Sequence, residues 1–330
     1  MFRQALGMRM ARLKAAPDQV AVYHCISRVV GGQFLLDDDG KEHLATLLLR
    51  LSRFCGLEVI TYCMMGNHFH LLLRVPQRQE LSDQELLQRL EHFYGKRGVL
   101  TVLAREGFEK RGGIDRDLRQ GLLERLGDVS AFMKEFKQRF SRWYNRHTGR
   151  FGTLWAERFK SVLVENEPGT LRTVAAYIDL NPVRAGLVQD PKDYRFCGYA
   201  AAVAGQAAVR QGLMSCLQPA SWATAAAEYR RNLFVTAGHS GSSQKMALDR
   251  ETILAELARG GQLSLPQVLR VRVRHFTDGV ILGSRGYVNE VFRQHREKFG
   301  SQRKDGARTI RGASLPDLTA LRDLQVRAMG

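Results

Sequence analysis

The chain has 330 residues, of which 44% are hydrophobic, so it can bury at least one sizeable core and is not disordered throughout. It carries 50 Lys and Arg against 33 Asp and Glu, a formal net charge of +17 at pH 7. An excess of this size favours a polyanionic partner, and nucleic acid is the commonest large one. A solvated basic surface without a specific ligand would have the same composition.

Membrane and secreted classes fit the sequence poorly. No apolar run approaches the roughly 20 residues that cross a bilayer, and residues 1–22 lack the pattern of a signal peptide. The five cysteines are odd in number and form no CxxC pair, which favours reduced thiols and argues against a zinc ribbon. We therefore expect a cytoplasmic protein that does not contact a membrane.

The first structured stretch predicts a β-α-β-β order. Residues 20–28 are rich in β-branched and aromatic side chains and predict a strand that ends at a glycine pair. Apolar residues recur at helical spacing over 41–55, which predicts an amphipathic helix. Residues 57–64 predict a second strand, and a tight turn at 65–67 leads into a third strand that begins at His68.

The next stretch completes the pattern after an interruption. Residues 77–128 are charged with helical patches, and we expect a mostly helical insertion. An aromatic stripe predicts a long helix over 128–147, and residues 158–165 predict a fourth strand. Asn166 can cap a further helix, which has Pro168 in its first turn and should run to Asn181, where Pro182 stops it. The order β-α-β-β-α-β, followed by an extra helix, is that of an α+β, ferredoxin-like antiparallel sheet with helices packed on one face.

Composition divides the chain into four regions. Residues 1–19 are a basic lead-in, and residues 20–190 form the main domain with its insertion. Residues 191–243 form a connector that ends in a Gly/Ser linker. Residues 244–330 have helix candidates at 249–258, 264–273 and 284–298. Basic residues flank two of these candidates, which favours a small helical DNA-binding module.

The third strand carries a candidate metal site. Because successive strand residues point to opposite faces, His68 and His70 should project from one face while Phe69 and Leu71 occupy the other. Two neighbouring neutral imidazoles can bind a divalent metal. Paired histidines also occur as hydrogen-bonded surface residues, and His24 on the first strand could line the same site or be an ordinary strand histidine.

The helix that precedes Pro182 carries a candidate nucleophile. Tyr177 and Asn181 lie one turn apart beside its packing stripe, so a phenol and an amide oxygen could face the two imidazoles. A metal could then polarise a phosphodiester while the tyrosine attacks phosphorus. Tyr177 could instead be a packing residue, Asn181 could end the helix, and Tyr144 is the rival nucleophile.

Four motifs occur in an order that resembles one known family. They are Tyr23-His24-Cys25-Ile26-Ser27-Arg28, Met64-Met65-Gly66-Asn67-His68-Phe69-His70-Leu71-Leu72, Gly152-Thr153-Leu154-Trp155 with Arg158-Phe159-Lys160, and Tyr177-Ile178-Asp179-Leu180-Asn181-Pro182-Val183-Arg184-Ala185-Gly186. The region that carries them, about residues 10–200, resembles the single-tyrosine HUH transposases and is most similar to the REP-associated tyrosine transposases.

This resemblance implies a ferredoxin-like HUH endonuclease domain in which His68 and His70 bind Mg²⁺ or Mn²⁺. The place of Asn181, one turn after Tyr177, makes its amide oxygen a candidate third ligand. The resemblance also implies that Tyr177 is the catalytic nucleophile, leaving a 5′-phosphotyrosine and a free 3′-hydroxyl that can be rejoined. The implied substrate is single-stranded DNA, often beside a hairpin. Phosphate and base contacts are expected from Ser27, Arg28, Arg150, Trp155, Arg158 and Lys160.

Two departures from the compact family pattern leave other properties open. These departures are the insertion at 77–128 and the long C-terminal extension. Because of them, the sequence does not determine whether the protein is a monomer or a homodimer, or how it selects its target. A non-catalytic DNA-binding or regulatory protein derived from a transposase is the alternative function. An RNA-binding sheet is a weaker alternative, because it would carry aromatic residues where this sequence places imidazoles.

Overall fold

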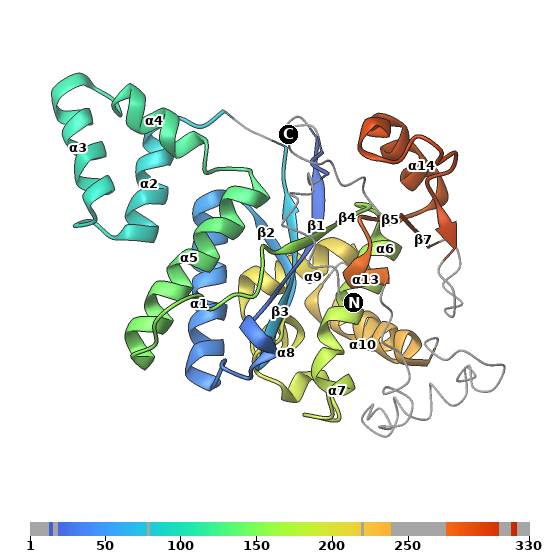
Figure 1. Cartoon of the computed structure of the whole chain (residues 1–330). Coiled ribbons are helices and arrows are strands. Elements are labelled where there is room, and N and C mark those ends of the chain that lie inside the picture. The colour runs from blue at the N-terminus through green and yellow to red at the C-terminus, as the bar shows by residue number, and fades with distance from the viewer. Residues whose placement is uncertain are drawn as a thin grey trace.

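The computed structural model describes residues 13–15, 19–77, 80–218, 221–238, 275–309 and 318–321. Within these ranges the protein is a layered α+β structure around one sheet (Figure 1). No helix of the described chain has both the length and the apolar character needed to span a membrane.

The first half of the sheet has the order that the sequence predicts. Strands β1 (Ala21–Arg28), β2 (Glu58–Met64) and β3 (His68–Val75) are linked by helix α1 (Asp38–Cys55) and a tight turn. Strand β3 lies between β1 and β2 and is antiparallel to both. Its alternating register against β1 pairs Arg28 with His68 and Ile26 with His70.

A second helix and strand complete the ferredoxin-like core. Helix α5 (Val129–Thr148) begins at the N-cap Asp128, whose side chain accepts hydrogen bonds from the Ser130 and Ala131 amides. Strand β4 (Lys160–Val164) then pairs antiparallel with β1, so the order β2-β3-β1-β4 is that of a βαββαβ sheet. The predicted fold class is confirmed.

Helices α1 and α5 cover one face of the sheet. The aromatic stripe of α5 is buried there, and Phe136 packs edge to face against Phe69 of β3 with ring centroids 5.5 Å apart. Trp143, predicted in the same stripe, lies at its margin and stacks on His43 of α1. Phe69 points into this layer, so the side chains of its strand neighbours His68 and His70 face the opposite layer.

The opposite face is covered by helices that follow β4 in the chain (Figure 1). Helix α6 (Pro168–Asp179) packs on β2 and β3, and α9 (Ala207–Leu217) packs on β2. A Cβ atom on Gly212 would lie 2.1 Å from the carbonyl oxygen of Val59, so glycine allows the backbone of α9 to lie directly on the sheet. The remaining helices of this layer are the short α7 (Asn181–Arg184), α8 (Gly198–Val203) and α10 (Trp222–Gly238).

The region predicted as a helical insertion contains helices α2 (Asp83–Tyr94), α3 (Val99–Arg111) and α4 (Arg116–Leu123). Helix α2 begins with a capping box, in which the Ser82 side chain accepts from the Glu85 amide and Glu85 accepts from the Ser82 amide. These helices project from the α1 and α5 layer on the side away from α6 (Figure 1).

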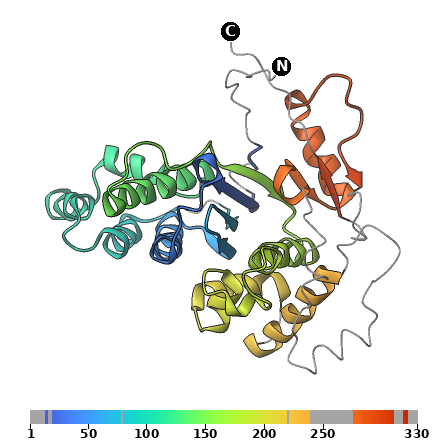
Figure 2. The same cartoon turned by 60° about the horizontal axis from the view of Figure 1, so that its bottom comes forward.

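The C-terminal region differs from the helical module that the sequence predicts. It adds strands β5 (Ile281–Gly283), β7 (Thr319–Leu321) and β6 (Arg308–Thr309) to the sheet, giving the described order β2-β3-β1-β4-β5-β7-β6. Its described helices are α13 (His275–Asp278) and α14 (Arg285–Gln294) (Figure 2). The predicted helices at 249–258 and 264–273 and the linker at 239–243 lie outside the described residues. Strands of two or three residues carry too little alternation to be recognised from sequence.

Candidate functional site

The two histidines of β3 and the predicted tyrosine lie in one layer. The imidazole centroids of His68 and His70 are 5.1 Å apart, and the Tyr177 ring of α6 lies 6.2 Å from that of His70. The Tyr177 ring is also 6.2 Å from His24 of β1. The structure therefore brings together three of the residues that the sequence analysis singled out, with His24 as a fourth member.

His24 links the sheet to the C-terminal region. Its Nδ1 lies 2.8 Å from the carbonyl oxygen of Phe276, and its Nε2 lies 2.9 Å from Nδ1 of His70. Burial lowers the pKa of His24 to about 4, although the Phe276 carbonyl opposes the shift. Burial also holds the pKa of His70 well below its ordinary value, and the neighbouring imidazoles, Arg184 and Arg28 add to the effect.

These two hydrogen bonds fix the tautomer of His70. A carbonyl oxygen can only accept, so Nδ1 of His24 must donate to Phe276. A neutral His24 then has an unprotonated Nε2, which accepts from Nδ1 of His70. His70 therefore carries its proton on Nδ1, and its Nε2 keeps a lone pair that can bind a metal.

His68 is held in the same tautomer by a separate contact. The amide nitrogen of Asn67 donates to the Gly32 carbonyl at 3.1 Å, which orients the Asn67 oxygen toward His68. Nδ1 of His68 lies 2.6 Å from that oxygen and must donate to it. When its ring is neutral, His68 therefore carries its lone pair on Nε2, as His70 does.

Tyr177 is buried, with 4% of its surface exposed. The Arg184 guanidinium lies 4.2 Å from the centroid of its ring and also donates to its backbone carbonyl. A cation in this position favours negative charge on the phenol oxygen. The Phe276 ring, which comes from the C-terminal region, packs against the Tyr177 ring with centroids 4.6 Å apart and contributes to its burial.

Asn181 begins the short helix α7 directly after α6. Its amide nitrogen donates to the carbonyls of Tyr177 and Ile178, at 3.3 and 3.0 Å. The side chain therefore satisfies the C-terminal carbonyls of α6 through its nitrogen, and its oxygen is the atom left for a ligand role. Pro182, expected to stop the preceding helix, sits in the first turn of α7.

Asp179 anchors the helix that carries Tyr177. Its fully buried carboxyl accepts from Thr61 at 2.8 Å, from the Tyr199 amide at 3.1 Å and from the Tyr229 hydroxyl at 2.5 Å. Burial raises the pKa of this carboxyl to about 7, although the three donors oppose the shift. These bonds join α6 to β2, α8 and α10, and so fix the position of Tyr177.

The residues expected to contact DNA divide into two groups. Arg28, Arg158 and Lys160 are exposed near the end of β1 that pairs with His68. Arg150 is partly exposed and donates to the Thr153 carbonyl. Ser27 is buried and has no hydrogen-bond partner among the described residues, because strand alternation turns it to the face with Phe69. The Ser27 hydroxyl is covered in this structure, and the DNA contact expected from it stays a prediction.

Trp155 has 8% of its surface exposed, and its indole nitrogen donates to the Lys137 carbonyl at 3.3 Å. Its ring packs edge to face on Phe69 with centroids 5.3 Å apart. The open stacking surface expected from the sequence is largely covered. Trp155 still contributes to the wall of a cavity beside α5.

A divalent metal fits the chemistry of the histidine pair. Two neutral imidazoles supply nitrogen donors and leave the other positions to oxygen ligands such as phosphate or water. No group of three or more His, Cys, Asp or Glu side chains suitable for a metal occurs in the described chain. His68 and His70 would therefore form an open site rather than a closed structural one.

Sequence reasoning left three functional contacts unassigned. His24 was ambiguous, although strand alternation places it on the face of the HxH pair. Arg184 lies within the quoted Tyr177 motif, seven residues after the tyrosine, which was a usable signal. Phe276 gave no signal, because it reaches the site from a region far along the chain.

Comparisons with known proteins point to a transposase family and to a solved transposase structure. Residues 19–95 match the sequence model of a family described as "Transposase IS200 like". A solved structure of a REP-associated tyrosine transposase bound to a REP hairpin is similar over 60% of this chain and 87% of that chain, with 16% identity and a TM-score of 0.39. No curated protein matches the chain.

Proposed function

We propose that this chain, whose residues 19–95 match the sequence model of a family described as "Transposase IS200 like", is a metal-dependent endonuclease and strand transferase for single-stranded DNA. The family supports a transposase-like role in DNA processing. The finer proposal depends on the residues of the site. Its substrate would be a single strand beside a hairpin, as found in repeats.

Tyr177 would supply the nucleophile. Its phenol oxygen attacks the scissile phosphorus, the bond to the 3′ oxygen breaks, and the protein retains a 5′-phosphotyrosine. Attack by a free 3′-hydroxyl on that ester restores a phosphodiester and releases the tyrosine. The Arg184 guanidinium, 4.2 Å from the ring centroid, would favour the phenolate both as nucleophile and as leaving group.

His68 and His70 would hold a divalent ion, with the Asn181 oxygen as a candidate third ligand. When bound, such an ion polarises the phosphate and neutralises charge that develops on its oxygens. The nitrogen donors favour Mn²⁺ over Mg²⁺, which prefers oxygen ligands. His24 and Asn67 orient the two rings through their Nδ1 atoms.

The observation that carries the proposal is the meeting of three separate elements at one place. Tyr177 of α6 lies 6.2 Å from both His70 of β3 and His24 of β1, measured between ring centroids. A phenol beside His70, whose Nε2 keeps a lone pair for a metal, is an arrangement suited to phosphodiester attack. A core tyrosine with only a packing role would not need these partners.

A nicking assay with hairpin-bearing single strands and Mn²⁺ or Mg²⁺ tests the proposal. The intact protein should cut the strand and stay attached to the 5′ end. Replacing His68 and His70 by Ala should abolish cutting while DNA binding persists. Cutting that continues unchanged in the double variant would contradict the assignment of the metal ligands.

The second candidate is a non-catalytic DNA-binding protein with the same fold. The packing of Phe276 on Tyr177 favours it, because only 4% of the tyrosine's surface is exposed in this conformation. The same nicking assay separates the two functions, since a binding protein would shift the DNA without cutting it under any metal condition.

A further inference from the structure

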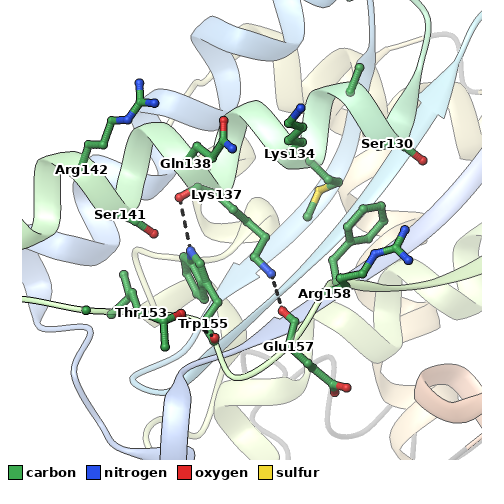
Figure 3. A pocket seen from close by; sticks show the side chains of 15 residues that line it. Ser130, Lys134, Lys137, Gln138, Ser141, Arg142, Thr153, Trp155, Glu157 and Arg158 are labelled. Atoms are coloured by element: carbon green, nitrogen blue, oxygen red, sulfur yellow. Dashed lines mark hydrogen bonds between the residues drawn. The ribbon is translucent and has the colours of Figure 1, made fainter. Parts of the chain in front are cut away.

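A cavity of about 770 Å³ opens between α5 and the loop before β4, on the sheet face away from the histidines (Figure 3). Helix α5 and the loop at 152–159 form its two walls. The polar side chains from α5 are those of Ser130, Lys134, Lys137, Gln138, Ser141 and Arg142. The volume is within the range of about 300–1,000 Å³ that small-molecule sites occupy, so it can hold one nucleotide.

The cavity is positively charged. Lys134, Arg142 and Arg158 surround it, and none of the three has an ion pair or hydrogen bond within the described chain. Glu157 is the one acidic residue among the described lining residues, and its carboxylate lies 3.5 Å from the Lys160 ammonium. Cations that lack an internal partner raise the local concentration of anions, so the favoured ligand carries phosphate.

The loop wall is fixed to the helix by reciprocal contacts. The Lys137 ammonium donates to the Glu157 carbonyl at 2.7 Å and lies 5.4 Å from the Trp155 ring centroid, while the Trp155 indole donates to the Lys137 carbonyl (Figure 3). Trp155 and Phe159, with 8% and 7% of their surfaces exposed, add apolar surface for a base. Gln138 and Ser141 supply hydrogen-bonding groups for its edge.

The same loop is bonded to the strand end beside the metal candidates. The Ala156 amide donates to the Arg28 carbonyl at 3.0 Å, and Val29 forms a β-bridge with Trp155. Arg28 pairs across the sheet with His68. The exposed Arg28 and Arg158 therefore lie on a connected path from the candidate site to the cavity.

We propose that this cavity binds one unpaired nucleotide of single-stranded DNA, separate from the scissile phosphate. Lys134 and Arg158 contact its phosphate, and the base occupies the cavity. This inference rests on the proposed function for the identity of the strand. It adds a subsite that would hold flanking DNA while Tyr177 reacts.

The test measures equilibrium binding in a chain that carries Tyr177→Phe, so that cleavage cannot contribute. The probe is fluorescein-labelled oligothymidylate, followed by fluorescence anisotropy over a range of salt concentrations. Each of Lys134→Ala and Arg158→Ala should weaken binding about fivefold near 0.1 M salt and reduce the salt slope by about 0.7, because each removes one phosphate contact. The control variants Lys96→Ala and Arg97→Ala remove exposed cations of the insertion and should leave binding unchanged.

A cavity-filling variant separates an occupied cavity from a merely basic surface. Ser141→Trp should weaken binding without changing the salt slope, provided that circular dichroism and the melting temperature show a folded protein. Gln138→Trp, which also leaves the charge of the cavity unchanged, serves the same purpose if Ser141→Trp fails to fold. Binding that is unchanged in the folded filling variant, or weakened equally by the Lys96 and Arg97 controls, would overturn the subsite.

The outcomes distinguish this inference from the proposed function. Unchanged binding in the cavity variants, in a protein that still forms the tyrosine adduct, overturns only the subsite. If the cavity variants weaken binding but the unsubstituted protein forms no tyrosine adduct with DNA, only the catalytic proposal is overturned. Tighter binding of oligouridylate than of oligothymidylate would assign the cavity to RNA and contradict the proposal.

Discussion

Nε2 of His24 lies 2.9 Å from Nδ1 of His70, and this hydrogen bond fixes which nitrogen of His70 faces a metal. Removing such a partner of a metal ligand typically costs 10- to 100-fold in metal affinity. We expect His24→Leu to weaken Mn²⁺ binding by about that factor, measured by isothermal titration calorimetry. In the metal-free protein, ¹⁵N spectra should show His70 losing its single Nδ1–H tautomer.

Two variants control this experiment. His24→Gln retains an oxygen that can accept from His70, so it should keep most of the metal affinity. His92→Leu changes an exposed histidine of α2 and should have no effect. Equal Mn²⁺ affinity in His24→Leu and the unsubstituted protein would show that His24 does not position the ligand.

Phe276 covers the candidate nucleophile, so its removal should make Tyr177 accessible. In Phe276→Ala we expect faster nitration of Tyr177 by tetranitromethane and faster formation of the DNA adduct, because the ring now 4.6 Å from Tyr177 would be gone. Phe292→Ala is the matched control, since it removes a buried ring of the C-terminal region that packs on Phe299. Equal reactivity of Tyr177 in all three proteins would contradict the covering role.

The buried carboxyl of Asp179 predicts a specific dependence of stability on pH. Its pKa in the folded protein is about 7, above the ordinary value of 3.8. Between these two pH values the carboxyl is therefore mostly protonated in the folded protein and mostly ionised in the unfolded protein. Its contribution to the free energy of unfolding must therefore fall as the pH rises from about 4 to 7 and stay constant above. The change across this window is on the order of 4 kcal/mol.

Asp179→Asn tests this dependence because its side chain does not titrate. Urea unfolding at a series of pH values should show the variant gaining stability relative to the unsubstituted protein as the pH rises toward 7. Comparing the two proteins cancels the opposite contribution of His24, whose lowered pKa adds stability over an overlapping pH range. A stability difference that does not vary with pH would contradict the raised pKa.

Much of the sheet could be predicted because its signals are local. The alternation around His68 and Phe69 predicted the two faces of β3, and the aromatic stripe around Phe136 predicted the layer that covers one of them. The same alternation, applied to β1, would have placed Ser27 with Tyr23 and Cys25, away from His24.

The C-terminal contacts could not be predicted for a physical reason. Strand β5 pairs parallel with β4 over Leu163 and Val164 alone, and the partners are separated by more than a hundred residues. Such a short pairing leaves no recognisable periodicity. The placement of Phe276 against His24 and Tyr177 follows from that pairing, so it became visible only in the folded structure.

The most direct test of the account is to identify the residue that becomes attached to DNA. The protein is incubated with hairpin-bearing single-stranded DNA and Mn²⁺, the DNA is digested, and the modified peptide is sequenced by mass spectrometry. We predict a nucleotide attached to Tyr177. The adduct should be absent in Tyr177→Phe and present in Tyr144→Phe, because the Tyr144 hydroxyl donates to the Leu35 carbonyl and is not the nucleophile. An adduct that persists in Tyr177→Phe, or that maps to Tyr144, would contradict the assignment of Tyr177 as the nucleophile.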